Sequence, residues 1–328
     1  MSIKNKILFF VAYLFTVSIL FSQPQYSEYN GMSGAFSRMG FGARGMGMGN
    51  AMVSVVNGNL VSYYNPAVST FQEGNLFQTS YSFLSLDRTL NFLSFTKKLE
   101  IGKRKKRIAG ISIGIINAGV SGIDGRDNQG LKTGDLSTSE NQFFLSFSNR
   151  FSDKFSLGVG IKFYYFKLYE QITSTALGID IGAIYLLNKN ISLAASINDI
   201  NSKYKWDTSN LYGLEGNSTR YNFPLLFRFG VSYKLSNPNL LASVEFEHSD
   251  AQTDFIRVGA EYNIFENLFL RGGVDRISIS NFDIPARPSL GFSYLKKFDS
   301  FKVGINYAFV MEPYSSYDSH IIGVEIIF

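Results

Sequence analysis

The last ten residues, 319–328, read SHIIGVEIIF and alternate large apolar residues with smaller or charged ones. Side chains alternate between the two faces of a strand, so this pattern predicts a β-strand with two different faces. One face carries Ile322, Val324, Ile326 and Phe328, and the other carries Ile321, Gly323, Glu325 and Ile327. A soluble protein seldom leaves such a strand as its frayed last element. We therefore expect the strand to pair with another one.

Aromatic residues are unusually frequent in the chain. Its 328 residues include 31 Phe, 19 Tyr and one Trp, which together make 16%. This supply suits a sheet whose ends lie at water–lipid boundaries. The chain has no cysteine, which excludes a disulfide framework and a thiolate metal site. Beyond residue 22 no run of about 18 apolar residues occurs, which excludes ordinary transmembrane helices, so we expect any membrane crossing to use strands.

Residues 1–22 have the pattern of a secretory signal peptide. Lys4 and Lys6 precede the apolar run ILFFVAYLFTVSILF, and cleavage is expected near Ser22. An N-terminal anchor helix is the alternative, but the apolar run is shorter than the roughly 20 residues that a span needs. We predict that the mature chain is exported.

From residue 76 onward, fourteen segments of roughly ten residues are β-rich or alternating, the weak pattern that each strand of a membrane β-barrel gives. They lie near 76–86, 88–99, 107–117, 141–151, 155–168, 176–187, 191–199, 224–235, 240–248, 254–264, 268–277, 287–297, 301–310 and 319–328. From the third segment on, the connections alternate between long and short, and the longest are 118–140 and 200–223. We predict an all-β fold, a 14-stranded antiparallel transmembrane β-barrel over 76–328.

The two faces of the predicted strands have different compositions. In 155–168, one face carries Leu157, Val159, Ile161, Phe163 and Tyr165, and the other carries Gly158, Gly160, Lys162 and Tyr164. We expect the apolar face to meet lipid and the other to line the lumen, where charges need water or partners. The expected lumen charges are Lys162, Asp180, Arg228, Lys234, Glu245, Glu247, Arg257, Glu261, Arg271, Asp275, Lys302 and Glu325. A soluble sandwich with these residues on its wet face is the alternative. In a barrel the last strand can pair with the first and leave no free edge.

Residues 23–75, between the signal peptide and the first strand, are rich in Gly and Met. We predict a compact plug or hatch inside one end of the barrel, because glycines allow close backbone approach and methionines fill irregular gaps. The stretch 40–45 formally fits the G-x-G-x-x-G pattern of dinucleotide sites. No Asp or Glu lies between Glu28 and Glu73, however, so the acidic residue of such a site is missing and no cofactor is expected.

The stretch GAFSRMGFGARGMGMGNA, followed by YYNPA, resembles the N-terminal signature of the PorV/PorQ family, exported barrels similar in fold to the FadL long-chain fatty-acid transporters. The resemblance rests on a plug motif of Gly40, Gly42, Arg44, Gly45, Gly47, Gly49, Asn65 and Pro66. It implies fourteen strands, a plug and an outer-membrane location. For some members it also implies an accessory role in type IX secretion. Phe328 resembles the C-terminal insertion signal of outer-membrane barrels.

Two functions remain open, and outer-membrane lipid is an expected partner in both. The first is a non-enzymatic accessory protein that binds secreted cargo or secretion-system subunits through its outer loops. Tyr204, Trp206 and Tyr212 in the loop 200–223 suit such binding. The second is an uptake channel for long-chain fatty acids or other hydrophobic small molecules, with 34–70 as a movable hatch.

We expect no catalytic or metal site. The two histidines, His248 and His320, lie near strand ends, and adjacent residues of a strand point to opposite faces, so EHSD at 247–250 cannot form a triad by itself. Glu245 and Glu247 lie close to Arg257 in the alternation and are expected to be ion-paired.

The basic run KKLEIGKRKKR, 97–107, holds most of the basic excess behind the net charge of +5. Such a run often binds nucleic acid, but export argues against a nucleic-acid partner. We expect either a solvated turn or a docking site for an acidic partner.

Overall fold

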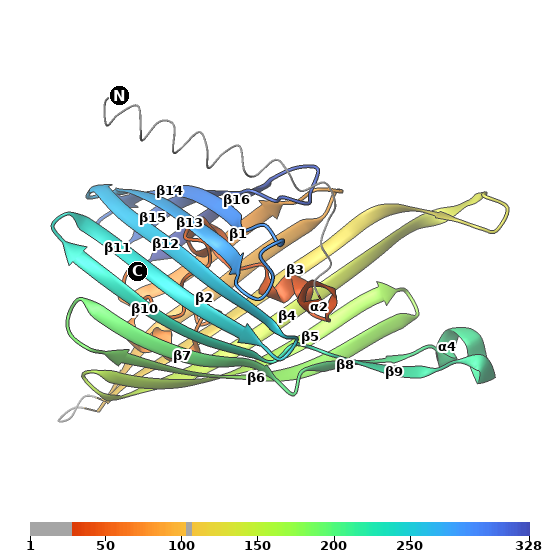
Figure 1. Cartoon of the computed structure of the whole chain (residues 1–328), viewed down its shortest axis with the longest axis horizontal. Helices are drawn as coiled ribbons and strands as arrows, with labels where there is room; N and C mark the ends of the chain where they lie inside the picture. Colours follow the sequence, from red (N-terminus) through yellow and green to blue (C-terminus); the bar gives the residue numbers. More distant parts are fainter. Residues whose placement is uncertain (1–27, 103–106) are drawn as a thin grey trace.

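The computed structural model describes residues 28–102 and 107–328. In this part of the chain, fourteen strands form one closed antiparallel barrel, as predicted (Figure 1). They are β1 (Asn75–Phe83), β2 (Thr89–Ile101), β3 (Arg107–Arg126), β4 (Lys132–Ser152), β5 (Phe155–Tyr169), β6 (Ile172–Leu186), β7 (Ile191–Ile200), β10 (Leu226–Ser236), β11 (Asn239–Ser249), β12 (Thr253–Phe265), β13 (Leu268–Ser278), β14 (Arg287–Lys297), β15 (Lys302–Val310) and β16 (Ser319–Ile327). The predicted signal peptide lies outside the described residues. Among those residues, no helix has the length and apolar character to cross a membrane.

The barrel is closed by the first and last strands, as expected from the C-terminal sequence. Eight residue pairs join β1 to β16, from Leu76 opposite Ile327 onward. Asn75 and Phe328 then exchange two backbone hydrogen bonds, with N···O distances of 2.7 and 3.0 Å. The C-terminal strand is therefore a central strand of a continuous sheet, and the sheet has no edge for another chain to pair with.

The two ends of the barrel differ in their connections. One end, here called the turn end, carries Phe328 and short connections such as 153–154 and 237–238; the other, called the loop end, carries the tight turns 170–171 and 250–252 together with the longest connection, between β7 and β10. The prediction of a loop at 118–140 is wrong, because this stretch is a β-hairpin. Strands β3 and β4 continue through it as paired strands and turn at 127–131. The predicted loop 200–223 likewise contains a two-stranded sheet of β8 (Lys203–Asp207) and β9 (Ser218–Asn222), with α4 (Ser209–Tyr212) and η3 (Gly213–Glu215) at its tip. Both hairpins project from the loop end (Figure 1).

The outer face of the barrel is apolar and its inner face is small or polar. On β5, the residues predicted to meet lipid are all exposed, namely Leu157, Val159, Ile161, Phe163 and Tyr165. The residues predicted to line the lumen are all buried, namely Gly158, Gly160, Lys162 and Tyr164. The pleat therefore separates a lipid-compatible surface from a filled interior.

Polar side-chain pairs interrupt the apolar outer face toward the loop end. On β2, β3 and β4, the amide Nδ2 of Asn91 donates to Asn117 Oδ1 at 3.2 Å, and Asn117 Nδ2 donates to Asn141 Oδ1 at 2.7 Å. Two further contacts on outward faces are His248 with Asp254, on β11 and β12, and Tyr307 with His320, on β15 and β16. We define these three groups of residues as the outer polar girdle.

The described part of the predicted plug, 28–74, lies inside the barrel. It contains α2 (Glu28–Gly31), η1 (Ala35–Arg38), α3 (Gly42–Gly47) and η2 (Pro66–Phe71). Asn65 caps η2, because its side-chain oxygen accepts a hydrogen bond from Ala67 N at 2.9 Å and Pro66 occupies the first turn. The methionines Met46 and Met48 are fully buried, and η2 packs against β3, β4 and β5 while α3 packs against β14 and β15.

Because η2 lies close to β5, we predict that alanine substitutions at two inward-facing glycines of β5 will differ in their effect on the free energy of unfolding. A Cβ on Gly158 would lie 2.3 Å from the carbonyl carbon of Pro66, whereas a Cβ on Gly160 would lie 3.5 Å from Asp180 Cβ, an ordinary contact. Gly158→Ala should lower the free energy of unfolding by about 1–3 kcal/mol through overpacking. The matched control Gly160→Ala should change it by less than about 0.5 kcal/mol. Urea unfolding of the barrel in lipid vesicles measures both, and equal effects would contradict this packing.

Candidate functional site

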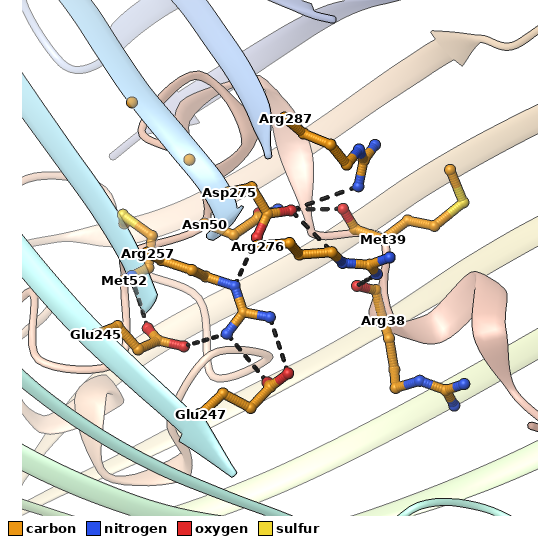
Figure 2. A network of polar contacts seen from close by, with 12 residues as sticks. Arg38, Met39, Asn50, Met52, Glu245, Glu247, Arg257, Asp275, Arg276 and Arg287 are labelled. Carbon is orange, nitrogen blue, oxygen red and sulfur yellow. Dashed lines mark hydrogen bonds and ion pairs between the residues drawn. The ribbon is translucent and has the colours of Figure 1, made fainter. Parts of the chain in front are cut away.

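A buried ion-pair network lies on the lumen wall formed by β11, β12 and β13 (Figure 2). At its centre, Arg257 donates from Nε to Asp275 Oδ1 at 2.6 Å and from Nη1 to Glu245 Oε1 at 3.0 Å. Its Nη2 donates to Glu247 Oε1 at 3.0 Å. Glu245 and Glu247 therefore share a guanidinium, as the strand alternation predicts, and serve as structural partners of Arg257.

The plug is attached to this network by its own hydrogen-bond donors. Glu245 accepts from the backbone N–H groups of Met52 and Val53 at 3.1 and 3.0 Å, Asp275 accepts from Asn50 Nδ2 at 3.1 Å, and Glu247 accepts from the Tyr29 hydroxyl at 2.9 Å. Burial and the adjacent Glu247 carboxylate raise the pKa of Tyr29 to about 12, so the hydroxyl keeps the proton that it donates. Charge-assisted hydrogen bonds of this kind fix the plug against one side of the lumen.

A second cluster holds the plug helix α3 near the turn end. Arg44 donates from Nε and Nη2 to the two carboxylate oxygens of Glu261, both at 2.8 Å, and Arg271 Nε donates to Glu261 at 2.7 Å. Arg44 Nη1 and Nη2 also donate to the carbonyls of Asn59 and Asn57. Burial alone would lower the pKa of Arg44, but the Glu261 carboxylate outweighs burial and raises it. Arg44 therefore joins the plug to the wall through a bidentate ion pair with Glu261, here called the Arg44 latch.

A third charged cluster joins β5, β6 and the end of β7 without the plug. Lys162 Nζ lies 2.8 Å from Asp180 and 3.2 Å from Asp199, and Tyr164 donates to Asp199. Of the twelve charges expected in the lumen, all are buried except Lys234 and Lys302, which lie near the turn end. The prediction that buried lumen charges find partners holds for these clusters.

Most glycines of the predicted plug motif pack against a wall or turn the chain. A Cβ on Gly47 would lie 3.4 Å from Gly291 Cα, and Gly49, at φ +57°, approaches Val274 so closely that a Cβ would lie 2.5 Å from its nitrogen. Gly40 and Gly42 also have positive φ, and Gly45 lies within α3. The motif thus contributes packing and the Arg44 latch, and we find no ligand-binding geometry at its glycines.

A cavity of about 580 Å³ opens at the loop end, between the plug and the barrel wall. Its apolar lining includes Ala35, Phe36, Met39, Leu84, Leu86, Ala118, Val120, Phe255, Ile284, Pro285 and Pro313. The four arginines that border it all have partners. Arg38 donates to plug carbonyls, Arg88 to the carbonyl of Ser85, Arg276 to Asn30 and Arg287 to Asp275. The cavity is therefore mainly an apolar site. The sequence does not indicate it, because its lining comes from the plug, seven strands and three connections.

The three aromatic residues predicted to bind a partner lie in different environments in the structure. Tyr204 is only 1% exposed, because it points into an aromatic cluster whose ring centroids lie 5.0 Å away at Phe223 and 5.7 Å away at Phe166. Trp206 packs on the same cluster, 5.1 Å from Phe166. Trp206 is half-buried, and Tyr212, at the hairpin tip, is 61% exposed. The cluster fixes the base of the hairpin, a role that side-chain type alone did not reveal.

The remaining candidate residues make ordinary contacts. His248 Nδ1 lies 2.7 Å from Asp254, and His320 Nδ1 lies 2.7 Å from the Tyr307 hydroxyl. Over residues 28–102 and 107–328, no group of three or more His, Cys, Asp or Glu side chains could hold a metal ion. Part of the basic run, 103–106, lies outside the described residues, so docking of an acidic partner stays a prediction.

Comparisons with known proteins agree on the fold. No protein-family model and no curated protein matches the chain. Among solved structures, a FadL homologue of Pseudomonas aeruginosa has a TM-score of 0.58 at 12% identity and covers 88% of this chain and 98% of its own. The toluene transporter TodX of Pseudomonas putida has a TM-score of 0.56 at 14% identity and covers 88% and 96%. The chain is an outer-membrane β-barrel with a FadL-like fold. Membership of the PorV/PorQ family is not supported by these matches.

The ion-pair network predicts a large cost for losing Arg257. Arg257→Met leaves three buried carboxylates without their shared cation, so the free energy of unfolding should fall by about 3–5 kcal/mol. Arg126→Met, which removes the exposed ion pair with Asp124 on the β3–β4 hairpin, should cost less than about 1 kcal/mol. Urea unfolding in vesicles provides the measurement, and similar losses for both variants would contradict the structural role of the network.

Proposed function

We propose that the protein is an outer-membrane channel for an apolar small molecule, with the loop-end cavity as the entry site and the plug as the hatch. The observation that carries this proposal is the cavity itself. Its volume of about 580 Å³ and its mainly apolar lining are typical of sites for small molecules. The FadL-like fold, which this chain shares with a toluene transporter, supports the same function.

Uptake by whole cells tests this function. Cells whose own hydrophobic channels are deleted should take up radiolabelled toluene or oleate faster when they express the protein. Ala118→Trp should reduce the rate to that of cells without the protein, because the indole fills the cavity that Ala118 lines. The control Ile113→Trp places the same side chain on the lipid face of β3, where Ile113 is 53% exposed, and should not change uptake. Equal uptake by expressing and empty cells would reject the function.

A second candidate function is that of a type IX secretion accessory of PorV/PorQ type. The observation that favours it is the apolar tip of the β8–β9 hairpin, where Leu211, Tyr212 and Leu214 are 41%, 61% and 106% exposed. Exposed apolar residues on a fixed support are typical of interaction sites.

Replacing the three tip residues tests the second candidate. The combined variant Leu211→Ser, Tyr212→Ser and Leu214→Ser should lose a secretion-system subunit or cargo protein that co-purifies with the parent from native outer membranes. The Tyr204 cluster is untouched, so the hairpin base should stay folded. Leu131→Ser, at the exposed tip of the β3–β4 hairpin, is the control. Unchanged co-purification would argue against this function.

A further inference from the structure

Two lumen carboxylates lack the partners that the other lumen acids have. The buried or half-buried acids that form ion pairs with Lys or Arg are Asp180, Asp199, Glu245, Glu247, Glu261, Asp275 and Glu312. Within the described part of the chain, neither Glu140 on β4 nor Glu325 on β16 makes a hydrogen bond or an ion pair. Glu325 is only 3% exposed, so its carboxylate is also largely removed from bulk solvent. A buried carboxylate without a donor is costly unless something supplies one.

Both unpaired carboxylates border cavities. Glu140 lines the loop-end cavity. Glu325 lines a narrow space of about 30 Å³ between α3 and strands β1, β15 and β16, and also a cavity of about 150 Å³ at the turn end. Asn306 lines the narrow space as well, and its buried Oδ1 has no donor. Unpaired acceptors therefore occur at both ends of the plug.

The contact between α3 and this wall depends on packing. Among the described residues, no hydrogen bond joins α3 to β1, β15 or β16, in contrast to the network on β11, β12 and β13. The two surfaces meet through small residues, since a Cβ on Gly47 would lie 3.5 Å from Ala308 Cβ and one on Gly42 would lie 3.7 Å from Ser80 Oγ. Opening this contact therefore breaks no hydrogen bond, whereas opening the contact with β11, β12 and β13 breaks several charge-assisted ones.

Arg44 also borders the narrow space, but it does not neutralise Glu325 by contact. Its Nε, Nη1 and Nη2 atoms are all bonded to Glu261 or to the carbonyls of Asn57 and Asn59. A molecule that entered between α3 and the wall would therefore meet the oxygens of Glu325 and Asn306 as free acceptors.

We infer that the transported molecule is an apolar compound with a neutral or cationic hydrogen-bond donor, an alcohol or an amine, and that it passes between α3 and the wall of β1, β15 and β16. This inference rests on the proposed channel function. Glu140 receives the donor group in the loop-end cavity, and Glu325 with Asn306 receives it at the narrow space. A transported carboxylate would bring a second negative charge against Glu140 or Glu325 and would offer neither of them a hydrogen-bond donor, so it is disfavoured beside these two side chains.

Thiol labelling tests the route without a transported substrate. The chain has no cysteine, so Ser80→Cys introduces a single thiol in the narrow space. Cationic aminoethyl methanethiosulfonate should modify it at least about fivefold faster than anionic sulfonatoethyl methanethiosulfonate, after correction for the rates on free cysteine. The control is Ser243→Cys, a buried serine that faces the plug from β11, next to Ser54. It should react far more slowly with both reagents.

The role of Glu325 is tested in the same assay. Adding Glu325→Gln to Ser80→Cys should bring the ratio of cationic to anionic rates close to one. Adding Glu266→Gln, which neutralises an exposed carboxylate at the same end of the barrel, should leave the ratio unchanged. If the thiols of Ser80→Cys and Ser243→Cys were modified at equally low rates, the proposed route would be wrong. If Glu325→Gln left the ratio of cationic to anionic rates unchanged, the proposed role of Glu325 would be wrong.

Uptake of matched probes separates this inference from the channel function. Cells expressing the parent protein should take up octanol and octylamine faster than octanoate, and Glu140→Gln or Glu325→Gln should reduce the difference. Preference for octanoate would overturn the assigned substrate class. Failure to take up any of the three probes, or toluene or oleate, would instead overturn the proposed channel.

Discussion

Backbone hydrogen bonding in lipid is the constraint on which the rest of the structure depends. The hydrocarbon core offers no partner to an N–H or C=O group, so a sheet can cross it only as a closed cylinder. Closure requires the first and last strands to pair, and β1 and β16 do so over eight residue pairs. The alternation of side chains then decides which residues meet lipid and which fill the interior.

The lumen of a fourteen-stranded barrel is too wide for wall side chains to fill, and the plug fills much of it. Plug residues such as Met46, Met48 and Tyr64 thus form the hydrophobic core that a sandwich would build between two sheets. Charges on β11, β12 and β13 hold the plug through Arg257 and Arg44, while the nearby contact of α3 with β1, β15 and β16 relies on small residues. The plug is therefore ion-paired to some strands of the wall and only packed against others.

The fold was largely readable from the sequence because lipid imposes a period of two on every strand. The outward row on β5 and the closing strand at 319–328 were assigned correctly for this reason. The hairpins at 118–140 and 200–223 do not show the strand pattern in the sequence, because glycines and charges interrupt the alternation once strands leave the membrane. The partners of Glu245 and Glu247 could be anticipated from neighbouring strands. The contact of Arg44 with Glu261 could not, because 217 residues separate them and only the tertiary fold brings them together.

The outer polar girdle has a consequence for how the protein sits in its membrane. Asn91, Asn117 and Asn141 would lose hydration if they sank into hydrocarbon, so they set the depth of immersion on β2, β3 and β4. Ala118, which follows Asn117, lies on the lining of the loop-end cavity. This part of the cavity wall is therefore level with the girdle, where hydrocarbon gives way to headgroups, and the β3–β4 hairpin extends beyond that boundary.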